Sequence, residues 1–109
     1  MNFLRTAHFT DAWFDLPQEK RTEITAAAVA FHDKYLKAGK LKDTYTFIPA
    51  TTMMSVWEVG SLQELAVIMM ESPHVLPYVD SEVVPFLDHQ DVVKLVNAQS
   101  AAAKKVAKK

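Results

Sequence analysis

Cysteine is absent from this sequence and glycine nearly so, and both gaps narrow the chemistry that the chain can support. Without cysteine there are no disulfides, thiol nucleophiles or thiolate metal sites. Only Gly39 and Gly60 occur, which excludes a glycine-rich phosphate loop. No apolar run approaches the ~18 residues that a membrane span requires, and the N-terminus lacks a signal-peptide pattern. We therefore expect a soluble, cytoplasmic protein.

An excess of charge of either sign is also missing. The 12 Lys and Arg residues nearly balance the 13 Asp and Glu residues, so neither nucleic-acid binding nor disorder is indicated. The four histidines include no pair four residues apart and no H-E-x-x-H motif, so we expect no metal. The 109 residues are 50% apolar, which is enough for one domain with a buried core. We expect no cofactor, no nucleic acid and no membrane as partners.

Local patterns predict an alternation of strands and helices. Segments rich in β-branched and aromatic residues are predicted strands: residues 2–9, 42–48, 52–59 and 81–87. A first helix is predicted from Pro17 to Gly39, because apolar residues recur between them at helical spacing. A second helix should begin at the capping box Ser61-Leu62-Gln63-Glu64 and end before Pro73.

This order of elements is that of the ferredoxin-like fold: α+β, βαββαβ, with two helices on one face of a four-stranded antiparallel sheet. We expect this domain to span residues 1–89. Residues 90–109 should add a C-terminal helical extension with a basic tail, in which Val92 to Val96 begin a helix that docks on the domain or on a neighbouring subunit.

Both faces of the predicted sheet are apolar. In the third strand Ser55 and Trp57 point one way while Met54 and Val56 point the other. Because two helices cover only one face, the other face requires a second copy of the chain or residues 90–109. We expect a homodimer or larger oligomer in which two sheets pack as a dimeric α+β barrel.

The segment around the last strand carries prolines at 73, 77 and 85. Proline cannot donate a hydrogen bond to a sheet ladder, so Pro85 indicates an edge strand or a bulge. The segment either meets a second copy or protects the edge against aggregation. The predicted interface residues are Pro77, Tyr78, Asp80, Glu82, Phe86 and His89.

The same segment carries a family resemblance. The pattern Pro77-Tyr78-x-Asp80-x-Glu82-Val83, followed by His89, resembles the C-terminal signature of muconolactone isomerase-like proteins, small ferredoxin-like enzymes of aromatic-catabolic pathways. Further matches lie upstream: Gly39, Tyr45, residues 55–59 and Ser61. The resemblance implies a cofactor-free isomerase that transfers a proton within a small unsaturated lactone or enol-type substrate.

Two positions depart from the family pattern. The first helix reads Ala26-Ala27-Ala28-Val29-Ala30 where the isomerases carry acidic residues, and Thr46 stands where a basic residue is common. The alternative is therefore a non-catalytic module that binds a small ligand or builds an assembly on the same fold.

Histidine is the natural substitute for a missing carboxylate base, because its ordinary pKa lies near neutrality. The candidate bases are His32, at the edge of the apolar stripe of the first helix, and His8, on the same strand face as Leu4 and Thr6. Tyr45 and Ser55 are candidate hydrogen-bond donors to a substrate carbonyl, and Trp57 a candidate apolar wall. Each also has an ordinary packing interpretation, and His74, in a predicted loop, is expected to make only a structural contact.

Overall fold

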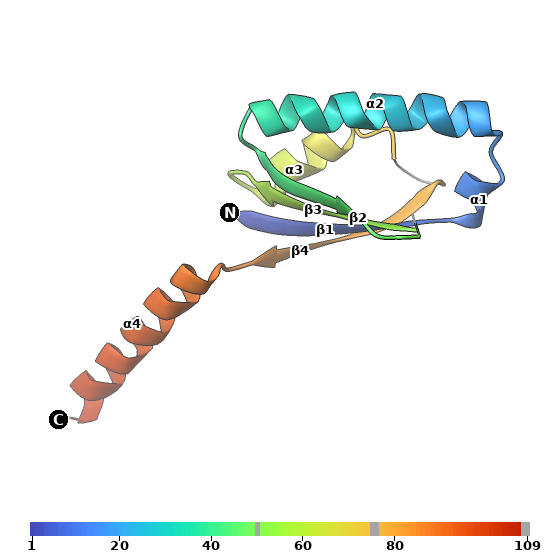
Figure 1. Cartoon of the computed structure of the whole chain (residues 1–109). Helices are drawn as coiled ribbons and strands as arrows, with labels where there is room; N and C mark the ends of the chain where they lie inside the picture. Colours follow the sequence, from blue (N-terminus) through green and yellow to red (C-terminus); the bar gives the residue numbers. More distant parts are fainter. Residues whose placement is uncertain (50, 75–76, 108–109) are drawn as a thin grey trace.

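The computed structural model describes residues 1–49, 51–74 and 77–107, in the order that the sequence predicts (Figure 1). The strands are β1 (Asn2–Phe9), β2 (Leu41–Thr46), β3 (Thr52–Glu58) and β4 (Val79–Phe86). The helices are α1 (Asp11–Phe14), α2 (Gln18–Lys37), α3 (Leu62–Met69) and α4 (His89–Ala107). The sheet is antiparallel with strand order β2-β3-β1-β4, and α2 and α3 lie on one of its faces. The predicted ferredoxin-like α+β fold is confirmed.

Helix α2 forms because its apolar residues recur at helical spacing and bury one stripe. Ala28, Phe31 and Tyr35 are buried on the side that faces the sheet. Phe31 and Tyr35 pack against Trp57 of β3, which is 0% exposed. The helix ends before Gly39, whose φ of +75° lies in the left-handed region that favours glycine. This packing fixes α2 over the centre of the sheet.

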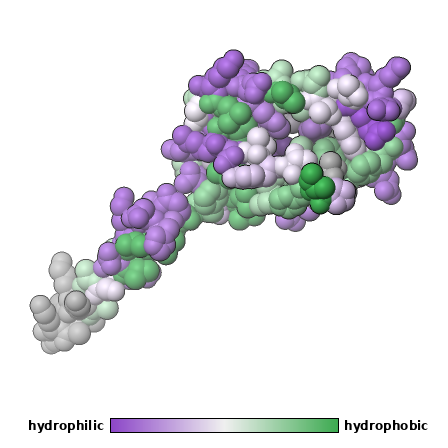
Figure 2. All heavy atoms as spheres, in the orientation of Figure 1, coloured by the Kyte–Doolittle hydropathy of each residue, from purple (hydrophilic) through white to green (hydrophobic). Residues whose placement is uncertain are grey.

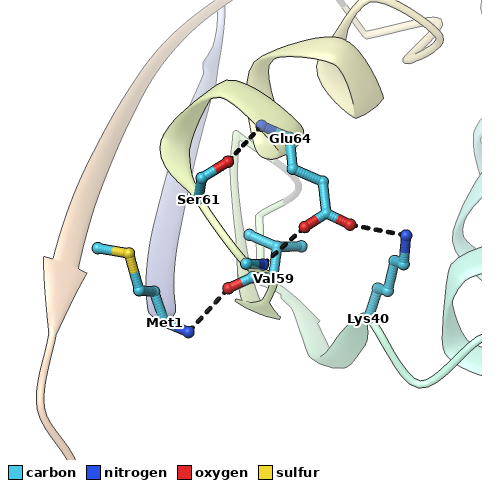
Figure 3. A network of polar contacts seen from close by, with 6 residues as sticks. Met1, Lys40, Val59, Ser61 and Glu64 are labelled. Carbon is cyan, nitrogen blue, oxygen red and sulfur yellow. Dashed lines mark hydrogen bonds and ion pairs between the residues drawn. The ribbon is translucent and has the colours of Figure 1, made fainter.

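The start of α3 is held by a polar network (Figure 3). The Ser61 hydroxyl accepts a hydrogen bond from the Glu64 amide at 3.1 Å, as the capping box predicts. The Glu64 carboxylate accepts a hydrogen bond from the Gly60 amide at 2.6 Å, so it also binds an amide at the start of the helix. It also pairs with Lys40 at 2.7 Å, and this hydrogen bond, followed by that from Gly60, lowers the pKa of Glu64. The network joins α3 to the turn that precedes β2.

The sequence analysis missed one element and displaced the ends of three strands by one or two residues. The connection after β1 contains the short helix α1, which is too short for its periodicity to show. β2 runs from Leu41 to Thr46 with a bulge between Leu41 and Asp43. β4 begins at Val79, two residues earlier than predicted, because Val79 pairs with Phe9 at the end of β1. Pro85 lies on β4, which is an edge strand as predicted.

The two faces of the sheet have different surroundings. Phe3, Arg5 and Ala7 of β1 are buried beneath the helices. Residues of the opposite parity form a second face that no helix covers, which we call the open face. Its members on the three longer strands include Leu4, Thr6, His8, Met54, Val56, Asp80, Glu82, Val84 and Phe86. Apolar side chains gather along the lower edge of the body in Figure 2, on the side away from α2.

Helix α4 projects from the body instead of docking on it (Figure 1). The molecule is therefore elongated, with extents of 70 × 27 × 23 Å. The sequence analysis expected this helix to dock on its own domain or on a neighbouring subunit, and the first of these alternatives is wrong. Within the described part of the chain, no helix has the length and apolar character needed to cross a membrane.

Candidate active site

A small cavity lies between α2 and the helix-covered face of the sheet. Its volume is about 240 Å³, below the ~300–1,000 Å³ typical of pockets for drug-sized ligands. The α2 side is formed by residues at helical spacing, and β2, β3 and the segment before β4 complete the wall. The lining residues are Thr25, Ala28, Val29, His32, Thr44, Thr46, Met53 and His74. No lining residue is a carboxylate, so the titratable groups in the wall are two imidazoles.

His74 is buried in an aromatic box. It is 3% exposed, and its ring stands edge-on to Phe9 at 5.2 Å and to Trp13 at 5.3 Å, measured between ring centroids. Trp13 comes from α1 and stacks on Phe9 at 4.9 Å, so α1 supplies one side of the box. Among the described residues, the Nε2 atom of His74 has no hydrogen-bond partner, and the atom itself is buried. The His74 side chain also borders the cavity.

Arg5 is a buried cation beneath the same region. Its side chain points to the helix side of β1, is 4% exposed, and donates from Nη2 to the backbone carbonyl of His74 at 3.0 Å. Among the described residues, its Nε has no hydrogen-bond partner and no carboxylate lies within ion-pair distance of the side chain. A buried charge without a counter-ion is costly, and an anionic ligand would offset that cost.

The electrostatics keep both imidazoles neutral. Burial lowers the pKa of His74 to about 4, and the positive charges of His32 and Arg5 act in the same direction. Burial also lowers the pKa of His32, Arg5 lowers it further, and Asp33 opposes the change. Burial likewise lowers the pKa of Arg5, whose ordinary value is high enough for the guanidinium to stay charged. At neutral pH the region therefore combines two neutral imidazoles with one buried cation.

The structure brings only part of the predicted site together. His32, a candidate base, lines the cavity. Ser55 and Trp57 lie on the correct face but bond to each other, with Trp57 Nε1 donating to Ser55 Oγ at 2.8 Å. Neither lines the cavity, because Trp57 fills the core among Phe31 and Tyr35.

The other two predicted residues lie on the open face. His8 is exposed there and makes a 3.0 Å hydrogen bond with Thr52. Tyr45 is 52% exposed and donates to Asp43 at 2.6 Å, which raises the pKa of its hydroxyl. The sheet separates both from His32, so they do not share its cavity.

Sequence reasoning missed Arg5 and His74. Arg5 gave one usable signal, because it alternates with Phe3 and Ala7 and so must share their buried face. His74 gave none, because its burial depends on α1 and β1, which are distant in the sequence.

The predicted interface residues are distributed over one end of the sheet and its open face. Thr10 holds this segment within the chain by two hydrogen bonds. Its hydroxyl donates to the carbonyl of Pro77 at 2.6 Å, and its backbone amide donates to the carbonyl of Tyr78 at 3.0 Å. Asp80, Glu82 and Phe86 lie on the open face, and His89 begins α4.

Two larger hollows lie outside this cavity. One, of about 520 Å³, shares Thr25 and Val29 with it and extends along α2 to Trp13. The other, of about 680 Å³, lies between the chain start and α4 and is bordered by Glu58, Asp88 and Asp91, with no imidazole. The first adjoins the cavity that the histidines line, and the second shares no lining residue with it.

Comparison with known protein families shows which family this chain belongs to. A family model described as "Muconolactone delta-isomerase" matches residues 1–92. The chain belongs to the muconolactone delta-isomerase family. A crystal structure of muconolactone isomerase shares the fold with a TM-score of 0.67 at 22% sequence identity, covering 82% of this chain and 91% of that chain. Comparison with curated proteins finds no match.

The family match also divides the chain. It includes the whole sheet, α1 to α3 and the His32 cavity, and it ends four residues into α4. The remainder of α4 thus lies outside the span that matches the muconolactone isomerase family.

Proposed function

We propose that this chain is a cofactor-free isomerase that transfers a proton within a small unsaturated lactone bearing a carboxylate. The observation that carries the proposal is a cavity bordered by two neutral imidazoles, with the guanidinium of Arg5 buried nearby and without a carboxylate partner among the described residues. Muconolactone, after which the family is named, is such a lactone. The cavity volume of about 240 Å³ suits a molecule of this size.

The reaction requires a base, an acceptor for developing negative charge, and a way to return the proton. His32 is the base: in its neutral form it removes a proton from carbon, and the electrons move through the double bond to the lactone carbonyl oxygen. The positive charge of Arg5 stabilises the resulting enolate from beneath the cavity. The protonated imidazole then returns the proton to another carbon of the same molecule. No atom or electron is gained or lost.

His74 orients the substrate. Its side chain forms one part of the cavity wall, and the aromatic box holds the ring in place. The open hollow along α2 gives the substrate access, because Thr25 and Val29 border both spaces.

The active form is proposed to be a homodimer or a larger oligomer. The open face exposes aliphatic groups, including Val84 at 52%, and Phe86 lies beside it on the same strand face. A second copy packed face to face would cover these groups and form the dimeric α+β barrel. This assembly includes Asp80, Glu82 and Phe86 in the interface.

Turnover of a panel of unsaturated lactones, with and without a carboxylate, tests the proposal. Proton exchange in deuterated water should accompany turnover in the wild type. His32→Ala should lower kcat by about 10²–10⁴-fold, the usual contribution of a general base. His8→Ala is the matched control, because His8 lies on the open face and should leave turnover unchanged. Equal losses in the two variants would contradict the assignment.

A binding module remains the second candidate, favoured by the absence of any carboxylate from the cavity wall. It predicts tight binding of the carboxylate-bearing lactone without proton exchange. Arg5→Met separates anion recognition from catalysis. It should weaken binding of the carboxylate form and have little effect on its uncharged methyl ester.

A further inference from the structure

Within the part of the chain that the structure describes, no other element packs along helix α4. Its 19 residues project from the body (Figure 1), and Leu95 and Val96 are 50% and 51% exposed. Most helices in proteins gain their stability by packing an apolar face, and a lone projecting helix lacks that contribution. Only residues 89–92 of this helix fall within the family match. An addition that exposes aliphatic groups in this way requires a partner.

One face of α4 carries a mostly apolar stripe in which bulky and small side chains occupy different turns. The spacings of three and four residues place these side chains together: Val92, Leu95, Val96, Gln99, Ala102 and Ala103. The sequence has a further valine at 106, at the same spacing. Two such helices side by side in parallel would oppose Leu95 to Leu95 and alanine to alanine, which leaves the alanine turn loosely packed. In antiparallel order about residue 99, Leu95 meets Ala103 and Val96 meets Ala102, and both turns are filled.

The distribution of charge along α4 also favours antiparallel pairing. Asp88 and Asp91 lie at the start of the helix, and the sequence has lysines at 104, 105, 108 and 109. Antiparallel pairing sets the acidic start of one copy beside the basic end of the other, whereas parallel pairing sets like charges together. The helix dipoles are also opposed in the antiparallel order.

We propose that α4 is an association helix that pairs antiparallel with α4 of a second copy of this chain, through the apolar stripe and with Gln99 near the two-fold axis. Size, charge and dipole each select the same partner and the same direction. The contact is independent of the open face of the sheet. A chain with two separate two-fold surfaces forms assemblies larger than a dimer.

Cysteine cross-linking tests this pairing. Because the chain has no cysteine of its own, any disulfide must form through the introduced residue. Gln99→Cys should oxidise to a disulfide-linked dimer, since the two copies of residue 99 meet at the axis. Asn97→Cys is the matched control: it is two residues away but on the opposite side of the helix, and it should remain mostly a single chain.

Direction is tested at Leu95. In the antiparallel pair the two copies of residue 95 are separated by about 12 Å along the axis, at 1.5 Å per residue, too far for a disulfide. Leu95→Cys alone should therefore not link. A mixture of Leu95→Cys and Ala103→Cys should give the heterodimer, identified by mass. Circular dichroism establishes that each variant remains folded.

Three results would overturn the proposal. Linking of Leu95→Cys as readily as Gln99→Cys would show a parallel pair. Absence of linking in every folded variant would show that α4 does not pair with itself. Binding of the wild type to vesicles containing an anionic phospholipid, together with no linking at residue 99, would assign the helix to a membrane surface instead.

Discussion

Acidification should destabilise this protein through His74. The ordinary histidine pKa is 6.5, and burial lowers that of His74 in the folded chain to about 4. Between these values the unfolded chain binds more protons than the folded chain, so the free energy of unfolding falls as the pH falls. At pH 5 this difference in proton binding would cost about 2 kcal/mol relative to neutral pH. Because the cavity has an opening to solvent, we expect a loss of about 1–2 kcal/mol.

Urea denaturation at pH 7 and at pH 5, followed by tryptophan fluorescence at constant protein concentration, measures this loss. Trp13 reports directly, since its ring contacts His74. His74→Phe retains an aromatic ring against Phe9 and Trp13 but cannot bind a proton, so most of the loss between the two pH values should disappear. His32, whose pKa is also lowered, accounts for the remainder. His89→Gln, at an exposed position, should behave as the wild type. An unchanged loss in His74→Phe would refute the reasoning.

Three further substitutions test other parts of the structure. Ser61→Ala removes the acceptor for the Glu64 amide and should lower the free energy of unfolding by about 1 kcal/mol in urea titrations. Gly39→Ala should lower it by about 1 kcal/mol as well, because a Cβ there meets no atom within 4 Å and only the positive φ is unfavourable. Tyr45→Phe should leave turnover in the proposed reaction unchanged, since Tyr45 lies on the open face; a tenfold loss of turnover would contradict its exclusion from the site.

The sequence predicted the fold because the fold depends here on local patterns. The apolar spacing of α2, the cap of α3 and the alternation in β3 each involve residues that are close in the chain. The register follows from burying one face of β1, which a shift by one residue would invert. Helix α1 could not be predicted, because four residues carry too little periodic signal and its position depends on contacts between Trp13 and distant rings.

The site was less predictable than the fold for a related reason. His32 could be identified because its place on α2 follows from helical spacing. His74 and Arg5 become partners only when β1 meets the segment before β4, 69 residues further along the chain. Local patterns contain no information about such a contact.

The described residues that line the cavity include no carboxylate, and this affects how the site would attract an anionic substrate. A carboxylate base at the cavity would have neutralised Arg5, and the site would then have little attraction for an anion. Alanines on α2 and neutral imidazoles at His32 and His74 leave the guanidinium uncompensated, so the region is positive before substrate binds. In the proposed reaction, the same arrangement would stabilise an enolate, whose negative charge develops only during proton transfer. The alanines on α2 are thus compatible with the proposed isomerisation, in which an imidazole serves as the base.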